Sequence, residues 1–343
     1  RPETVQCDID INKHLFVKKN KLPGPFPWVP LLGNALDLFK YRLNLPEYIK
    51  AVQLKYGDIC EIYMGPKRII ILSRSDIVYP IYTPSVAHNS KFLYRDSPNP
   101  GLNEIDLEKR GVIVNRNLAE WKVNRRFLEK TIMSKKFLKE FMEKEHEICL
   151  NMFKLWNVLS VKRQEIDLAE WVTKFAGDAT FITVTGQPAY SIFDYFESLG
   201  YEHNRDHIPV SEWRRSPKLI SAVLSIFNII PWFLVVPSII RHAPGLNFFN
   251  QKLLKNVGNL NDIILEIVRE RRAYIDSLPI DTQIPSDVLS LLLTANTKRD
   301  SPRTLIKSLD RSLDDQEVGG IMKDIFLGSF ETVTYYLRQN FCK

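Results

Sequence analysis

The chain has 343 residues, of which 45% are hydrophobic, 11% aromatic and 25% charged. This composition excludes fibrous and intrinsically disordered classes, and the length permits a large buried core. Its four cysteines, Cys7, Cys60, Cys149 and Cys342, include no C-x-x-C pair. That scatter argues against a disulfide framework and against a Cys-rich zinc site, so we expect a reducing compartment.

The net charge of +7 is concentrated in one segment. Residues 109 to 144 contain eleven Lys or Arg and four Glu, whereas the rest of the chain is balanced. This segment predicts one positive face that could attract an acidic protein, an anionic cofactor, a nucleic acid or a membrane surface.

The first predicted elements are a helix over 46–56, ending at Gly57, and a β-hairpin. The hairpin strands cover 59–64 and 68–72, are rich in β-branched residues, and meet at Gly65-Pro66. After the hairpin the apolar periodicity is helical almost throughout. The predicted helices cover 118–133, 136–156, 168–185, 247–274, 286–294 and 315–337.

Residues 219–240 form the longest uncharged stretch and are numerous enough to span a bilayer. Pro231 and Pro237 interrupt it, and proline breaks helix continuity. We therefore favour two short apolar helices, buried or dipping into a lipid interface, over a membrane span.

The last predicted helix changes character along its length. Asp314 and Glu317 form a capping box, and an apolar stripe follows at helical spacing. The stripe then narrows to small residues and hydroxyls at Gly328, Ser329 and Thr332. One interpretation is a notch for a flat ligand; the other is a close helix crossing in which Thr332 bonds back to the carbonyl of Gly328.

A second informative helix lies in the basic segment. Trp121 and Arg125 are four residues apart, so an indole N–H and a guanidinium share one face and suit a buried carboxylate. Lys122, Arg126 and Lys130 form the neighbouring stripe, which faces solvent. The alternative is an ordinary surface helix with a core Trp and a solvated Arg.

In this order, these segments resemble the cytochrome P-450 superfamily of haem-thiolate monooxygenases. Besides the two helices, the similarity is carried by segments that resemble the family's proline-rich hinge, first sheet and helix starts. The similar segments are Leu22-Pro23-Gly24-Pro25 with Gly33-Asn34, Lys55-Tyr56-Gly57-Asp58-Ile59, Ser90-Lys91-Phe92, Gly111-Val112-Ile113, Ser134-Lys135-Lys136-Phe137-Leu138 and Asp287-Val288-Leu289-Ser290-Leu291-Leu292.

The resemblance implies a mainly α fold: a cytochrome P-450-like helical haem domain with a small N-terminal β-sheet. Residues 1–21 would be a leader or linker after a missing anchor, and residues 22–343 the N-terminal two-thirds of one monooxygenase domain. Trp121 and Arg125 match the pair that holds a haem propionate in that family. Gly328 and Ser329 would lie against the cofactor, which is expected to be heme b.

The resemblance also assigns chemical roles. Thr332 and Glu331 would be catalytic, through a hydrogen bond to iron-bound oxygen and a proton relay, and Phe330 would wall the substrate pocket. Electrons would come from NADPH through a reductase whose acidic face docks on Lys122, Arg126 and Lys130. The expected substrate is lipophilic, and the expected location is the cytosolic face of the endoplasmic reticulum membrane, where apolar residues 219–240 meet the membrane surface.

Two departures from the family pattern qualify these expectations. Ser329 stands where the family's helix motif has Gly. The family's E-x-x-R motif and its F-x-x-G-x-x-x-C-x-G loop, whose Cys ligates iron, do not occur before Lys343, and Cys342 lacks the flanking glycines. We therefore expect a fold incomplete at the C-terminus, no metal ligand in this chain, and a fragment inactive alone. The alternative is a non-catalytic, truncated helical protein associated with membranes.

Other signals are weak. His203 and His207 have a spacing compatible with zinc, but no third ligand is suggested. The aromatic residues of the basic segment lie on the apolar sides of their helices, which disfavours nucleic acid as the partner.

Overall fold

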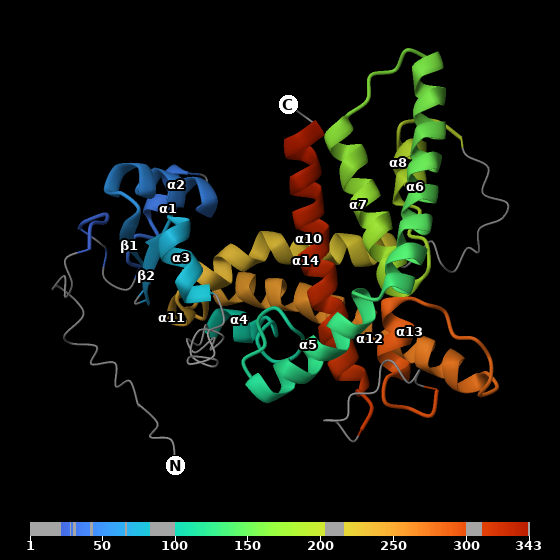
Figure 1. Cartoon of the computed structure of the whole chain (residues 1–343). Coiled ribbons are helices and arrows are strands. Elements are labelled where there is room, and N and C mark those ends of the chain that lie inside the picture. The colour runs from blue at the N-terminus through green and yellow to red at the C-terminus, as the bar shows by residue number, and fades with distance from the viewer. Residues whose placement is uncertain are drawn as a thin grey trace. The chain divides into compact units, whose positions relative to one another are not determined.

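A computed structural model describes residues 22–27, 29, 32–41, 44–65, 67–82, 100–202, 216–299 and 311–341 (Figure 1). The chain divides into two compact units, which are described separately: one comprises residues 1–102 and 229–250, and the other residues 103–228 and 251–343. The prediction of one domain over residues 22–343 stays a prediction. Residues 1–21, His203, His207 and Ser90-Lys91-Phe92 lie outside the described residues.

The first unit contains the predicted hairpin. Strands β1 (Ile59–Met64) and β2 (Lys67–Leu72) pair antiparallel with Ile59 opposite Leu72, as the alternation predicted. Helix α2 (Leu45–Tyr56) packs on the hairpin and ends at Gly57, which has a φ of 97°. The core between them includes Tyr48, Val52 and Ile62. The short helices α1 (Asp37–Lys40) and α3 (Ser75–Tyr82) precede and follow this α2-hairpin layer.

The apolar stretch 219–240 differs from its prediction. Helix α10 (Ser216–Val235) runs unbroken through Pro231, and the break comes at Pro237, before the short helix α11 (Ser238–Arg241). Pro231 removes one helical hydrogen bond, but Val236 still donates to the carbonyl of Trp232 at 3.1 Å. Residues buried at helical spacing on both sides of the proline favour continuity: Leu219, Val223, Ile226, Ile229 and Phe233.

No helix in the described ranges combines the length and apolarity that a bilayer crossing requires.

The second unit is helical, and the predicted helices are confirmed to within a few residues at most ends. They are α5 (Leu118–Ile132), α6 (Lys135–Val161), α7 (Leu168–Thr185), α12 (Asn247–Ser277), α13 (Val288–Thr294) and α14 (Asp315–Phe341), with α4 (Pro100–Glu104) and α8 (Ser191–Ser198) in addition. Side-chain caps fix several starts because each accepts an otherwise unsatisfied backbone N–H. Asn117, Ser134, Asp167 and Asp287 cap α5, α6, α7 and α13 in this way.

Helix α7 lies between α6 and α14, and aromatic contacts join it to both (Figure 1). The rings of Trp156 and Trp171 meet edge to face at 6.0 Å between α6 and α7. Phe181 and Phe326 lie 6.2 Å apart between α7 and α14. Residues 317–330 of α14, which take part in this packing, are mostly buried.

The capping box of α14 is confirmed. Glu317 donates its backbone N–H to Asp314 Oδ1 at 2.8 Å, and Asp314 N–H donates to Glu317 Oε2 at 2.9 Å. Arg311 donates to both oxygens of Glu317 and thereby holds the pKa of that carboxyl below its ordinary value. The apolar stripe that follows is buried, as predicted, at Val318, Ile321, Met322 and Phe326.

Candidate functional site

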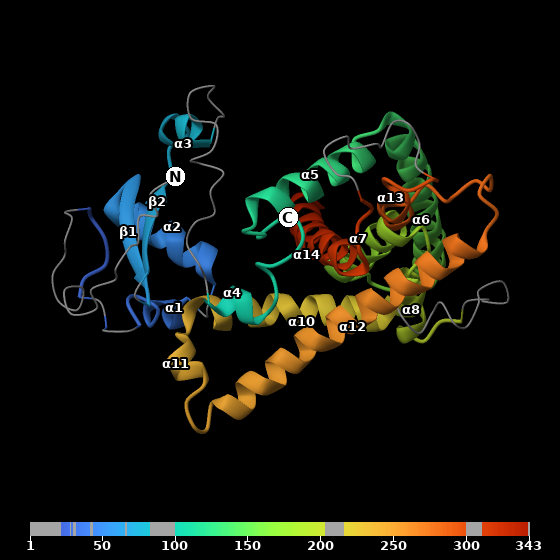
Figure 2. The same cartoon turned by 90° about the horizontal axis from the view of Figure 1, so that it is seen from below.

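Helices α5 and α14 carry the predicted site residues, and one loop, residues 105–117, contacts both helices. Figure 2 shows α5 beside α14, with this loop leading into α5. From α5, Asn124 donates to the carbonyl of Gly111 at 3.2 Å, a bond that Asn115 of the loop itself duplicates. Gly111 has a φ of 107°, which only glycine adopts readily.

Trp121 and Arg125 occupy different environments. The indole N–H of Trp121 donates to the carbonyl of Val112 at 2.7 Å, so this half-buried residue ties α5 to the loop. The side chain of Arg125 is 52% exposed, and its Nε donates to Glu129 Oε1 at 2.6 Å. Among the described residues, the two terminal nitrogens of Arg125 have no hydrogen-bond partner, so they can donate hydrogen bonds to an anionic group.

The hydroxyls of α14 bond back to their own helix. Thr332 donates to the carbonyl of Gly328, and Ser329 donates to that of Ile325, both at 2.5 Å. The local bond expected for Thr332 is therefore confirmed, and Thr332 is exposed. Since a hydroxyl that donates once keeps its lone pairs, Thr332 Oγ1 can still accept a hydrogen bond from a ligand.

Phe330 is buried, and its ring lies against Gly177 of α7. The side chains of Glu331 and Lys130 lie outside the described residues. On the neighbouring stripe of α5, Lys122 and Arg126 are exposed, as predicted.

Asp324 is the first functional candidate that sequence reasoning missed. It is almost completely buried on α14, and its Oδ2 accepts the backbone N–H groups of Val112 and Ile113, both at 2.6 Å. Bonds to an ionised acceptor are stronger than neutral ones and hold their donors in place. Asp324 therefore holds Val112, which Trp121 also contacts from α5, together with the next loop residue, Ile113.

Two glycines of α14 allow the loop to come this close. A Cβ at Gly320 would lie 2.6 Å from the Cβ of Arg110, and a Cβ at Gly328 would lie 3.1 Å from the Cδ1 of Ile113. Ile113 thus connects the Trp121 side of the site to the small-residue notch predicted on α14.

Lys323 is the second residue that the sequence analysis missed. Its Nζ donates to the carbonyl of Asp106 at 2.6 Å, to Asn261 Oδ1 at 3.2 Å and to Asp106 Oδ2 at 3.4 Å. Burial lowers the pKa of Lys323 below its ordinary value, and the nearby Asp106 opposes that shift. The only signal in the sequence was a Lys-Asp pair inside an apolar helix.

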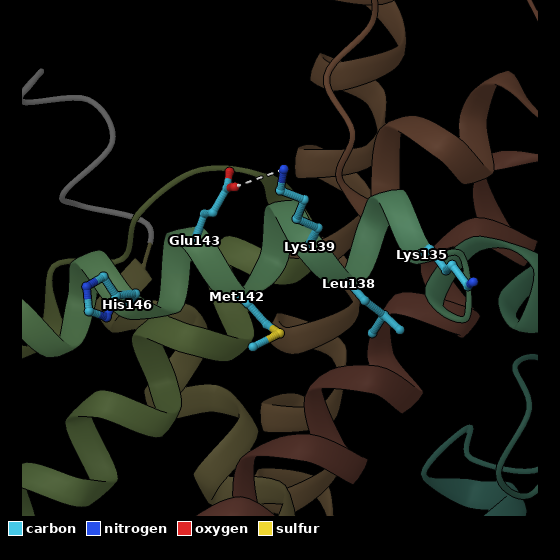
Figure 3. A pocket seen from close by; sticks show the side chains of 6 residues that line it. All are labelled: Lys135, Leu138, Lys139, Met142, Glu143 and His146. Carbon is cyan, nitrogen blue, oxygen red and sulfur yellow. Dashed lines mark ion pairs between the residues drawn. The ribbon is translucent and has the colours of Figure 1, made fainter.

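A shallow groove runs along the exposed side of α6 (Figure 3). Leu138 and Met142 supply its apolar part, and Lys139 and Glu143 form an ion pair of 3.9 Å beside them. Nothing in the structure indicates what covers this surface. Within the described ranges, no three His, Cys, Asp or Glu side chains are arranged to hold a metal ion.

A family model described as Cytochrome P450 matches residues 23–341. Cytochrome P450 2E1 of Sus scrofa is 26% identical over 340 residues, which cover 96% of this chain and 59% of that protein. Cytochrome P450 2E1 of Bos taurus is 25% identical over 275 residues, covering 78% and 48%. Cytochrome P450 2D10 of Rattus norvegicus is 33% identical over 129 residues, covering 36% and 24%. The chain thus spans about half to three-fifths of the length of the two 2E1 relatives.

Proposed function

Because the chain belongs to the cytochrome P450 family, we propose that it supplies an N-terminal part, about half to three-fifths, of a haem-dependent monooxygenase. The complete protein would insert one oxygen atom from O2 into a lipophilic small molecule. The observation that supports this most is the loop at Val112 and Ile113, which contacts Trp121 on one side and the Gly328 notch on the other. Arg125 and Thr332 are exposed, and each lies four residues beyond the helix residue that contacts this loop, Trp121 on α5 and Gly328 on α14.

The proposed cofactor is heme b, and α5 would hold one of its propionates. Arg125 fits this role because it is exposed and its terminal nitrogens are available to a carboxylate. Trp121 fits in part, since its N–H already donates to Val112 and would have to be shared or redirected. Haem, when bound, would supply the chemistry of dioxygen activation.

Thr332 and Glu331 are proposed to transfer protons at the α14 side of the site. Thr332 Oγ1 passes its proton along a hydrogen bond and takes another in return, while the apolar stripe of α14 excludes bulk water from the site. Gly328 and Ser329 have small side chains, so a planar ring could lie close to the helix backbone at the notch. Phe330 remains the proposed pocket wall, although its ring lies against α7.

The proposed electron source is NADPH, through a reductase with an acidic face. Exposed Lys122 and Arg126 supply the complementary charge, and Lys130 would extend it. The proposed location is the cytosolic face of the endoplasmic reticulum membrane. Exposed apolar side chains such as Ile239 and Phe248, in and after the stretch 219–240, are suited to a membrane surface.

Haem content of the complete protein provides the direct test. Replacing Trp121 and Arg125 together by Ala should weaken haem affinity by about tenfold or more, since each removes a donor to a charged group. Lys122→Ala is the matched control on the same helix and should retain full haem content. Unchanged haem content in the double variant would contradict the assignment of α5.

Two spectroscopic and kinetic measurements complete the test. The reduced, carbon monoxide-bound complete protein should show a thiolate-type band, and residues 1–343 alone should not. With 7-ethoxycoumarin as a lipophilic probe, Thr332→Ala should release more hydrogen peroxide per NADPH consumed while the Soret band stays unchanged. Equal peroxide release would remove Thr332 from the proton pathway.

A further inference from the structure

Lys323 is a charged residue in the interior of the second unit, with only 4% of its surface exposed. Burying an ammonium group is costly unless its donors find acceptors. Its three N–H donors have three recorded acceptors: the carbonyl and carboxylate of Asp106, and the amide oxygen of Asn261. The cost of burial is therefore offset only while these groups stay together.

The three acceptors come from two different segments. Asp106 lies in the loop after α4 and has a φ of 55°, a conformation that non-glycine residues seldom adopt. Asn261 lies on α12. Lys323 therefore joins the loop, α12 and α14 at one point. Lys109 also reaches the carboxylate of Asp106, at 3.7 Å from Oδ1, so the loop carries its own cation beside this point.

Asp324, the next residue, holds the same loop farther along, at Val112 and Ile113. The two neighbours thus have separate tasks. Asp324 fixes the part of the loop that contacts Gly328, whereas Lys323 fixes the part that precedes it and binds that part to α12. Loss of Lys323 would release Asp106 and Asn261 from α14, whereas the Asp324 bonds, the Arg110–Gln316 hydrogen bond and the Arg272–Asp315 ion pair would stay in place.

We propose that Lys323 is a positioning residue that acts as a latch, holding residues 105–110 and α12 against α14 and thereby limiting how fast small molecules reach and leave the Gly328–Thr332 face. This inference rests on the proposed function, because it assigns that face to ligand binding. Opening the latch exposes a buried ammonium group and breaks three hydrogen bonds at once, so openings are rare while Lys323 is present.

The test uses the complete protein and 4-phenylimidazole, a nitrogen ligand whose binding shifts the Soret band. Lys323→Met keeps an unbranched side chain that is one heavy atom shorter, and removes the ammonium group. We expect the association and dissociation rates both to rise by about tenfold, equivalent to about 1.4 kcal/mol, with an unchanged dissociation constant. A latch changes both rates together, whereas damage to the pocket wall changes the dissociation constant.

Hydrogen exchange supplies a readout that needs no haem. In Lys323→Met, the amides of residues 105–110 should exchange faster, and those of Val112 and Ile113 should stay protected. Asn261→Ala removes only the hydrogen bond from Lys323 to α12 and should therefore raise both ligand rates by a smaller factor. This variant provides the test if Lys323→Met does not fold. Lys252→Met, an exposed change on α12, is the control and should behave as wild type.

Three outcomes would contradict the latch: unchanged ligand rates in both variants, a raised dissociation constant at an unchanged association rate, or unchanged exchange of residues 105–110. Failure of the wild-type protein to bind haem would contradict the proposed function instead. The exchange measurement would then still decide whether Lys323 holds the loop.

Discussion

Removing the hydrogen bonds between Asp324 and the loop tests most directly whether this carboxylate holds the loop against α14. Asp324→Ala leaves the N–H groups of Val112 and Ile113 without the carboxylate that accepts both at 2.6 Å. The Val112 donor is buried and the Ile113 donor only partly so. Since each buried donor left unsatisfied costs about 1–3 kcal/mol, the free energy of unfolding should fall by about 1–4 kcal/mol. Asp324→Asn keeps one acceptor oxygen in a side chain of similar size, so its loss of unfolding free energy should be about half that of Asp324→Ala.

Urea unfolding followed by far-ultraviolet circular dichroism measures these losses, and hydrogen exchange locates them. In Asp324→Ala, the amides of Val112 and Ile113 should exchange faster than in the wild type. Asp262→Ala is the matched control, because Asp262 is exposed on α12, and its effect should stay within about 0.5 kcal/mol. A loss below about 1 kcal/mol in Asp324→Ala, with both amides still protected, would refute the reasoning, because buried donors would then tolerate the missing acceptor.

Two further predictions concern packing and pH. Gly320→Ala should destabilise the protein, because the new Cβ would lie 2.6 Å from the Cβ of Arg110. Gly258→Ala, whose new Cβ would have nothing within 4 Å, should instead stabilise α12 by about 0.5–1 kcal/mol. Urea unfolding compares the two variants, and equal effects on the free energy of unfolding would contradict the close approach of Arg110 to Gly320. Burial raises the pKa of Asp178 from 3.8 to about 6 although it accepts the N–H of Ser191. The folded state therefore binds this proton more tightly, and the resulting stability, about 3 kcal/mol, is present below about pH 4 and lost as pH rises through about 6. The difference in unfolding free energy between wild type and Asp178→Asn should change over that range, and a constant difference would contradict the shift.

The helices could be predicted from sequence where local signals agree. Helix α7 begins and ends as predicted because Asp167 caps its first turn and Gly186, with a φ of 71°, ends it. Between these ends, apolar residues recur at helical spacing, so propensity, capping and burial all favour the same element. The same agreement explains why the capping box of α14 was predicted correctly.

Of the two prolines predicted to break the helix in the stretch 219–240, Pro237 does so and Pro231 does not. The prediction was wrong at Pro231 because it gave both prolines equal weight. A proline inside a helix removes one hydrogen bond, and burial of residues on both sides of Pro231 offsets that loss. The residue before Pro237 has no comparable support, and α10 ends at Val235. Only packing distinguishes the two prolines, and packing is not a local property of the sequence.

The candidate site was predictable only in part, for a related reason. The spacing of Trp121 and Arg125 and the small residues of α14 are local patterns. The loop partners of Asp324 and Lys323 lie more than two hundred residues earlier in the chain, and Asn261, the other partner of Lys323, lies 62 residues earlier. No short window of sequence therefore contains both halves of any of these contacts. A charged pair inside an apolar stripe was the available sign that such partners exist, because buried charges require them.

One face of α14 carries both the residues that contact the loop and the hydroxyl of Thr332. Gly320, Asp324, Gly328 and Thr332 follow at intervals of four residues, so they lie on the same side of the helix. The first three receive the loop, and the fourth carries the hydroxyl. Four residues advance a helix by about 6 Å, which places Ile113, in contact with Gly328, about one turn from Thr332. Because Gly328 and Thr332 lie about one turn apart on the same helix, a shift of the loop at Ile113 also changes the space beside Thr332. The buried contacts that position the loop therefore matter as much as the hydroxyl.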